Sequence, residues 1–206
     1  MGYSSKDTYE AIMNCAKDEF LEKGFQKASM RRIAEKAGLT TGAMYNHFKN
    51  KEMIFEALVG DVAEGLYKLF VSEHELCHEL DSYIEDEAFD TMSDSTNKII
   101  DYMFDNYEIM KLILSSSHGT KYEHFGERLI EVEEMSTRKM MEKTGYKITA
   151  KDEFFIHTMA SSGMVNTYEV VKHGLTREEA YYYMEKIQKF YYAGWNEILN
   201  QELKLK

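Results

Sequence analysis

The chain has 206 residues and a formal net charge of −11, with 44% hydrophobic residues, two cysteines and no proline. Two cysteines exclude a disulfide-based scaffold, and there is neither a signal-peptide segment nor a run approaching the ~20 apolar residues of a membrane-spanning helix. We therefore expect a cytoplasmic protein with no membrane partner, and the absence of proline predicts an all-α fold.

The first predicted helix covers about residues 5–23, because apolar side chains recur along it at helical spacing. Two shorter helices follow. One begins after Ser29, a candidate N-cap, and the other is capped by Thr40. Met44 and Phe48 lie four residues apart in the second short helix, so we expect both side chains to point inward.

The outward side of this second short helix carries small or polar groups. They are Thr41, Gly42, Ala43, Tyr45, Asn46 and His47. A helix with a small first turn can lie deep in the major groove of DNA. Six basic residues and one acidic residue lie between Gln26 and Lys51, a local charge of about +5 that suits a DNA surface. The pattern predicts a helix-turn-helix that binds double-stranded DNA.

The stretch MRRIAEKAGLTTGAMYNHFKNKEMIFEAL strongly resembles the DNA-binding domain of the TetR family of transcriptional regulators. The family pattern falls on Ile33, Ala34, Ala37, Gly38, Thr40, Gly42, Tyr45, Phe48, Lys51 and Glu52. The resemblance covers roughly the first quarter of the chain. It implies a helix-turn-helix domain over residues 1–50 and a larger helical ligand-binding and dimerisation domain over residues 51–206.

Side-chain chemistry and the resemblance together assign roles at the DNA surface. Base contacts are expected from Arg31, Thr41, Ala43 and Asn46. Arginine can read guanine, asparagine can read adenine, and an alanine methyl can touch the thymine methyl. Phosphate contacts are expected from Ser29, Thr40, Tyr45, His47 and Lys51. Such contacts fix the register of the protein without reading sequence.

A long helix begins near Asn50, and further helices are predicted over about 96–106, 107–116, 122–143, 152–173 and 177–199. Nine acidic residues and no Lys or Arg lie between Glu73 and Asn97. We interpret this segment as a solvated acidic face and loop, with a rim that attracts a cationic ligand as the alternative. Thr176 and Glu179 form a capping box, which predicts the start of the last helix.

The resemblance further implies a repressor whose C-terminal helices enclose a small molecule and whose last two helices form a homodimer. A dimer places two recognition helices about 34 Å apart, as a palindromic operator requires. Candidate ligand contacts are Tyr102, Met103, Tyr107, Met110, Phe125, His157, Met164 and Tyr168. Such side chains suit a hydrophobic or aromatic ligand, and acidic surroundings favour a cation. The alternative is that they belong to the hydrophobic core.

One rival motif points to an enzyme. His74, Glu75 and His78 form H-E-x-x-H, in which two histidines bind zinc and the glutamate acts as a base. The charged Glu79 and the lack of a clear third ligand argue against a zinc-dependent hydrolase, while metal binding by His74, Cys77 and His78 is a weaker alternative. No nucleotide-binding loop or nucleophile elbow is present, so we expect no enzyme and no cofactor. A DNA-binding protein without a ligand is the third alternative.

Overall fold

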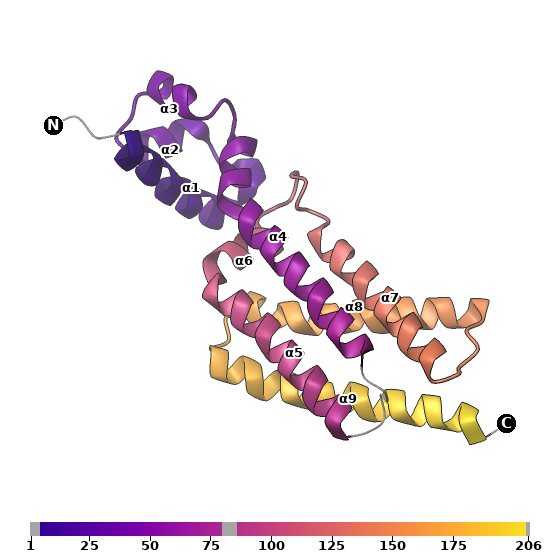
Figure 1. The fold of residues 1–206 in the computed structure, drawn as a ribbon. Coiled ribbons are helices and arrows are strands. Elements are labelled where there is room, and N and C mark those ends of the chain that lie inside the picture. The colour runs from indigo at the N-terminus through magenta and orange to yellow at the C-terminus, as the bar shows by residue number, and fades with distance from the viewer. Residues whose placement is uncertain (1–4, 80–85, 205–206) are drawn as a thin grey trace. The chain divides into compact units, whose positions relative to one another are not determined.

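The computed structural model describes residues 5–79 and 86–204, and these residues form nine helices and no strand (Figure 1). The helices are α1 (Ser5–Lys27), α2 (Met30–Lys36), α3 (Thr41–His47), α4 (Lys51–His78), α5 (Asp86–Asp105), α6 (Tyr107–Ser115), α7 (Phe125–Lys143), α8 (Ala150–Lys172) and α9 (Arg177–Lys204). The prediction of an all-α fold is therefore confirmed. Among the described helices, none is long and apolar enough to cross a bilayer.

Packing divides the chain into two compact units. The N-terminal unit comprises Met1–Gly65 and Asn106–Phe125, and the C-terminal unit comprises Leu66–Asp105 and Gly126–Lys206. Helix α4 contributes residues to both units, and α6 belongs to the N-terminal unit. These are units of packing, whereas the division at residue 50 concerns function and stays a prediction.

An aromatic cluster forms much of the core of the N-terminal unit. The Phe55 ring lies 5.2 Å from that of Phe20, 5.3 Å from that of Phe25 and 6.2 Å from that of Tyr122, measured between centroids. The three phenylalanines are almost completely buried. Aromatic pairs at such separations add to the free energy gained by burial. This core supports α1, which packs against both α2 and α6.

A buried carboxylate joins α1 to α2. Glu19 is completely buried, and its carboxylate accepts hydrogen bonds from the Ser29 backbone N–H at 3.2 Å, Arg32 Nε at 2.6 Å and Lys36 Nζ at 3.3 Å. Burial raises the pKa of Glu19, but these hydrogen bonds and the charge of Arg32 outweigh it, so the pKa lies below its ordinary value. Because α2 packs against α3 in turn, Glu19 also determines where α3 lies.

The start of α2 differs in detail from the sequence prediction. Ser29 does occupy the N-cap position, but its side chain makes no capping hydrogen bond. Its backbone N–H is held by Glu19 instead. The predicted caps of two other helices are confirmed. The Thr40 hydroxyl accepts from the Ala43 N–H at 3.1 Å, and Thr176 and Glu179 bond reciprocally at the start of α9.

The acidic segment from Glu73 to Asn97 is the main correction to the predicted helices. Helix α5 begins at Asp86 rather than near residue 96. The sequence prediction missed its first turns because the many polar residues there surround an apolar stripe that includes the buried Ala88. Glu73 is buried rather than solvated, so the prediction was wrong for that residue. Asp81 and Glu85, which belong to the same prediction, lie outside the described residues.

The Glu19 contacts predict a pH-dependent loss of stability on substitution. We expect Glu19→Gln to lower the free energy of unfolding by about 1–3 kcal/mol at pH 7, since the neutral amide cannot satisfy both cations and the Ser29 N–H. The folded-state pKa is depressed, so this contribution is present above the unfolded-state pKa of about 4.3 and is lost as pH falls through the folded value.

Urea denaturation of both proteins at pH 7 and at acidic pH measures this difference. Glu22→Gln is the matched control, because Glu22 is an exposed acidic residue on the same helix and surface substitutions usually change stability by less than about 0.5 kcal/mol. Equal stability of the Glu19→Gln and Glu22→Gln proteins at pH 7 would contradict the role given to Glu19.

Candidate DNA-binding surface and ligand cavity

Helix α3 is held by its inward side. Met44 is completely buried and Phe48 is 6% exposed, which confirms the prediction that both point inward. The Phe48 ring packs 5.6 Å from the ring of Tyr9 on α1, measured between centroids. The Thr40 cap fixes the first turn of the helix. Two buried side chains and one cap thus determine which face of α3 remains accessible.

The accessible face carries the residues that the sequence singled out. Thr41, Gly42, Tyr45 and Asn46 are exposed, whereas Ala43 and His47 are half-buried. Tyr45 keeps 50% of its surface exposed, although it is a large aromatic residue. A Cβ atom added at Gly42 would meet no atom within 4 Å, so the backbone is open there. A second macromolecule can therefore approach this face closely.

The basic residues beside α3 fall into two groups. Arg31 on α2 is exposed and forms no ion pair within the described residues, so its guanidinium is available. Arg32 and Lys36 are already paired with Glu19, and Arg32 also donates to the Lys27 carbonyl oxygen at 2.7 Å. The local positive charge that the sequence suggested is therefore partly neutralised inside the N-terminal unit.

Lys51 has a structural contact where a phosphate contact was predicted. Its Nζ donates to the carbonyl oxygens of Phe25 at 2.8 Å and Gln26 at 2.9 Å, and it lies 4.5 Å from the centroid of the Phe25 ring. These bonds satisfy carbonyl groups at the end of α1. The ammonium keeps a third N–H, so the phosphate contact stays a prediction.

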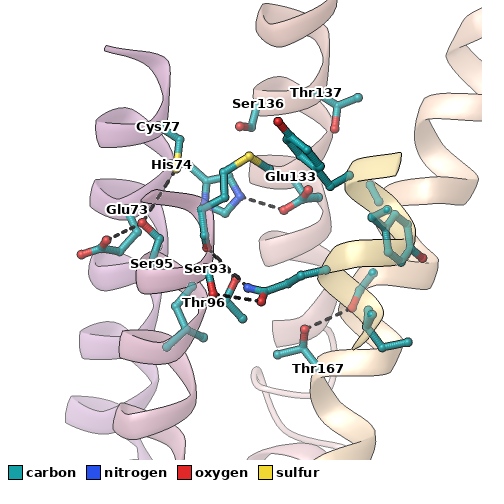
Figure 2. A pocket seen from close by; sticks show the side chains of 18 of the residues that line it. Glu73, His74, Cys77, Ser93, Ser95, Thr96, Glu133, Ser136, Thr137 and Thr167 are labelled. Carbon is teal, nitrogen blue, oxygen red and sulfur yellow. Dashed lines mark hydrogen bonds and ion pairs between the residues drawn. The ribbon is translucent and has the colours of Figure 1, made fainter. Parts of the chain in front are cut away.

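A cavity of about 200 Å³ lies within the C-terminal unit, with walls from α4, α5, α7, α8 and α9 (Figure 2). Its methionines are Met92, Met140, Met159, Met164 and Met184. Its aromatic side chains are Phe70, Phe89, Tyr191, Tyr192 and Trp195. Ligand sites for drug-sized molecules usually have volumes of roughly 300–1,000 Å³. The flexible methionines allow this smaller cavity to adapt to an apolar ligand.

A histidine and a glutamate face each other in this apolar wall. Figure 2 shows the His74 ring on α4 directed at the Glu133 carboxylate on α7, and Nε2 lies 2.7 Å from Oε2. The other ring nitrogen, Nδ1, lies 2.8 Å from the Phe70 carbonyl oxygen. A carbonyl oxygen only accepts, so Nδ1 carries a proton, and a proton on Nε2 completes the bond to an ionised Glu133.

The pKa values of the two groups move in directions that agree with this ion pair. Burial lowers the pKa of His74, but the charge and hydrogen bond of Glu133 more than reverse it, and the pKa is raised. Burial likewise raises the pKa of Glu133, but His74 outweighs it and the pKa is lowered. We therefore describe the pair as imidazolium and carboxylate.

A second carboxylate in the cavity wall is neutralised by its neighbours. Glu73 accepts hydrogen bonds from Lys98 Nζ at 2.9 and 3.1 Å and from the Ser95 hydroxyl at 2.8 Å. Figure 2 shows Glu73, Ser95 and Cys77 on the same side of the cavity. The remaining polar side chains of the wall are uncharged.

The contacts of His74 weigh against a zinc hydrolase. Zinc binds an imidazole through a nitrogen lone pair, but both ring nitrogens of His74 donate hydrogen bonds here. Within the described residues, no three or more His, Cys, Asp and Glu side chains are grouped so that they could hold a metal ion. His74 and Cys77, the weak metal candidates, instead line the cavity, and His78 does not.

Of the predicted ligand contacts, Met164 alone lines this cavity. Tyr107, Met110 and Phe125 belong to the N-terminal unit, and Met103 is buried in α5, the helix that also carries the half-buried Tyr102. His157 is exposed, with Nδ1 2.7 Å from Glu134 Oε1. Tyr168 is buried, and its hydroxyl has no hydrogen-bond partner within the described residues. The sequence analysis did not predict that Glu133 or the aromatic residues of α9, Tyr191, Tyr192 and Trp195, line a cavity. The spacing of these aromatic residues resembles that of residues in a helix core.

Comparisons with known proteins agree with the geometry of α2 and α3. The family model for bacterial regulatory proteins of the tetR family matches residues 12–58. The chain is 46% identical over 52 residues to the Transposon Tn10 TetC protein of Escherichia coli, covering 25% of the chain and 26% of that protein. It is 43% identical over 54 residues to the HTH-type transcriptional repressor BepR of Brucella suis, covering 26% of each.

The matched part of the chain thus spans about a quarter of the length of these two relatives. A comparison of folds extends further. NalD, the secondary repressor of the MexAB-OprM multidrug efflux pump in Pseudomonas aeruginosa, has a similar fold over 90% of this chain and 95% of its own, with a TM-score of 0.57 and 18% identity. The match of residues 12–58 to the family model and the fold shared with this solved structure support a TetR-like DNA-binding transcriptional regulator.

Proposed function

We propose that this protein is a transcriptional repressor that binds a palindromic DNA operator as a homodimer and leaves it when a small molecule occupies the cavity. The observation that carries the proposal is the accessible face of α3, where Gly42 and Ala43 allow close approach while Tyr45 and Asn46 offer polar groups. This proposed function includes no enzymatic step. It would be carried out in the cytoplasm, where the DNA lies.

The DNA-binding role divides into reading and positioning. Arg31, exposed and without an ion pair in the described part of the chain, is suited to a bidentate contact with guanine, and Asn46 to one with adenine. Tyr45 and His47 are suited to phosphate oxygens at the edge of the groove. Because Arg32 and Lys36 are paired with Glu19, we assign them to support of α2 rather than to DNA.

The surfaces of α8 and α9 support a homodimer. Phe154 and Val165 on α8 are 74% and 50% exposed, and Tyr182 and Phe190 on α9 are 65% and 74% exposed. Several large apolar residues left in water on neighbouring helices are typical of an interface with another protein. A second copy of the same chain, burying the same two helices, would make the two-fold assembly that a palindromic operator requires.

A ligand can release the protein from DNA if DNA and the ligand bind most tightly to two different conformations of the protein. DNA stabilises the conformation whose recognition helices fit successive major grooves, and the ligand stabilises another. The two bindings are then linked, so that the ligand weakens DNA binding by the factor by which DNA weakens ligand binding. Helix α4 is continuous through both packing units, and its C-terminal half supplies Phe70, Glu73, His74 and Cys77 to the cavity wall.

Selection from a pool of random DNA duplexes tests the proposal directly. We expect the purified protein to enrich a sequence with two-fold symmetry whose half-sites are centred about one helical turn, or a multiple of it, apart. Enrichment of no sequence, with equal retention of all duplexes, would contradict a sequence-reading regulator and favour the ligand-independent, sequence-indifferent DNA-binding alternative.

Removal of the Tyr45 hydroxyl should weaken DNA binding. We expect Tyr45→Phe to raise the dissociation constant for the selected operator about tenfold, because a hydrogen bond to a charged group contributes about 1.5–3 kcal/mol. Fluorescence anisotropy measures the constant. The matched control is Tyr182→Phe, which removes an exposed hydroxyl from α9 and keeps the apolar ring. Equal losses in both variants would contradict the phosphate contact.

A charge on the exposed face of α9 should dissociate the dimer. We expect Phe190→Glu to shift the sedimentation profile from dimer towards monomer, because two copies of the charge would be buried near the two-fold axis. Met135→Glu is the control, since Met135 is an exposed apolar residue, 57% accessible, on α7. A dimer that survives Phe190→Glu and dissociates with Met135→Glu would place the interface elsewhere.

A further inference from the structure

One oxygen of the Glu133 carboxylate is available to a ligand. Oε2 is bonded to His74, whereas Oε1 makes no hydrogen bond to any of the described residues. The side chain retains 34% of its surface accessible and lines the cavity (Figure 2). A carboxylate partly removed from water is costly unless its lone pairs are satisfied, so Oε1 favours a hydrogen-bond donor from a bound molecule.

The other charged groups of the cavity wall are not available to accept a hydrogen bond from a ligand. Both oxygens of Glu73 already accept hydrogen bonds, Oε1 from Lys98 and Oε2 from Lys98 and Ser95. The lining residues from α8 and α9 include no Lys, Arg, Asp or Glu. Glu133 is therefore the acidic group that can accept from a ligand, and His74 is its one basic neighbour in the wall.

The apolar surroundings suit the rest of such a ligand. Phe70 packs against His74 with 4.2 Å between ring centroids, and Phe89 packs edge-on against Tyr192 at 5.2 Å. Aromatic faces attract cations as well as hydrocarbon, and the effect grows where water is excluded. The methionines provide a polarisable wall that can follow the shape of an alkyl or aryl group.

We propose that the cavity binds small amphiphilic amines, with the protonated nitrogen donating to Glu133 Oε1 and the hydrocarbon part lying among the methionines and aromatic rings. The inference rests on the proposed function only in giving the cavity a ligand. It names the class of that ligand. His74 neutralises Glu133 within the protein, and a bound ammonium competes with His74 for the same carboxylate.

A carboxylic acid ligand fits this wall less well. It would have to bond to His74, but both nitrogens of that ring already donate to Phe70 and Glu133. Its charge would also lie beside the Glu133 carboxylate, and two carboxylates in one site repel each other. A neutral alcohol can donate to Oε1, but without the attraction between opposite charges.

Three probes of the same carbon skeleton test the inference by isothermal titration calorimetry: phenylbutylamine, phenylbutanol and phenylbutanoate. We expect the amine to bind at least about tenfold more tightly than the alcohol, and the carboxylate to bind weakest. Equal affinities, a preference for the carboxylate, or no binding of any probe at millimolar concentration would each overturn the inference.

Two variants separate recognition from a structural effect. Glu133→Gln should abolish the preference for the amine while leaving alcohol binding unchanged. His74→Gln should strengthen amine binding severalfold, because it removes the cation that competes for Glu133. Glu131→Gln, an exposed residue of the same helix, is the control and should have no effect. If both cavity variants remain folded by circular dichroism and weaken all probes equally, the residues are structural and the inference fails.

This test is independent of the DNA experiments. Selective amine binding together with failure to enrich any DNA sequence would leave the cavity assignment in place and overturn the proposed repressor. Sequence-selective DNA binding without amine selectivity would support the proposed repressor and overturn the assignment of the cavity to amines.

Discussion

The buried Glu19 carboxylate is the interaction on which the N-terminal unit depends. A fully buried charge is tolerated only when it is paired and hydrogen-bonded, and Glu19 meets both conditions through Ser29, Arg32 and Lys36. All three partners lie at or within α2, so the carboxylate fixes this helix on α1. Helix α3 in turn packs against α2, and its Met44 and the following Phe48 are buried. The direction in which Tyr45 and Asn46 point is thus a consequence of an acidic residue on another helix.

The same arrangement explains how an acidic protein can present a DNA-binding surface. The formal charge of −11 would repel DNA if it were spread evenly. Glu19 lies inside, where its charge is compensated by Arg32 and Lys36, while Arg31 remains exposed beside α3. The local field at α3 therefore reflects a few unpaired groups rather than the total charge of the chain. This division of the basic residues was visible only in the structure.

The cavity of the C-terminal unit also contains a partly buried ion pair, but there the hydrogen bonds of the carboxylate are incomplete. His74 and Glu133 also form an ion pair in an apolar setting, but one carboxylate oxygen is left without a partner in the described residues. At Glu19 every contact is internal, and the group serves the fold. At Glu133 an incomplete set of contacts favours a molecule from outside. In the proposed binding site, the incompletely satisfied carboxylate of Glu133 thus contrasts with the fully satisfied ion pairs of Glu19.

The sequence predicted local features well and long-range features poorly. The caps at Thr40 and Thr176 and the inward direction of Met44 and Phe48 depend on neighbours within four residues, so spacing alone predicts them. Glu133 is 59 residues from His74, and only the packing of α4 against α7 brings them together. Metal binding by His74, Cys77 and His78 was a weak alternative because imidazole and thiolate groups suit zinc. The spacing of residues in the sequence could not predict that His74 and Cys77 line a cavity.

Methionine and aromatic residues show the same limit. At helical spacing they look alike whether they fill a core, as Met103 does, or line a cavity, as Met164 does. The difference lies in whether the facing helices leave space, which depends on all five helices of the wall. The start of α5 was missed for a local reason, since its polar residues resemble a loop although Ala88 is buried.

The most direct test of the account is the salt dependence of binding to the DNA upstream of the protein's own gene, measured by fluorescence anisotropy beside a scrambled duplex. If the accessible face of α3 reads an operator, the upstream DNA will bind tightly and selectively. Its affinity will fall by about 10³-fold or more between roughly 50 and 200 mM salt, as expected for six to ten phosphate contacts. Weak binding to both duplexes with the same shallow salt dependence would contradict the account.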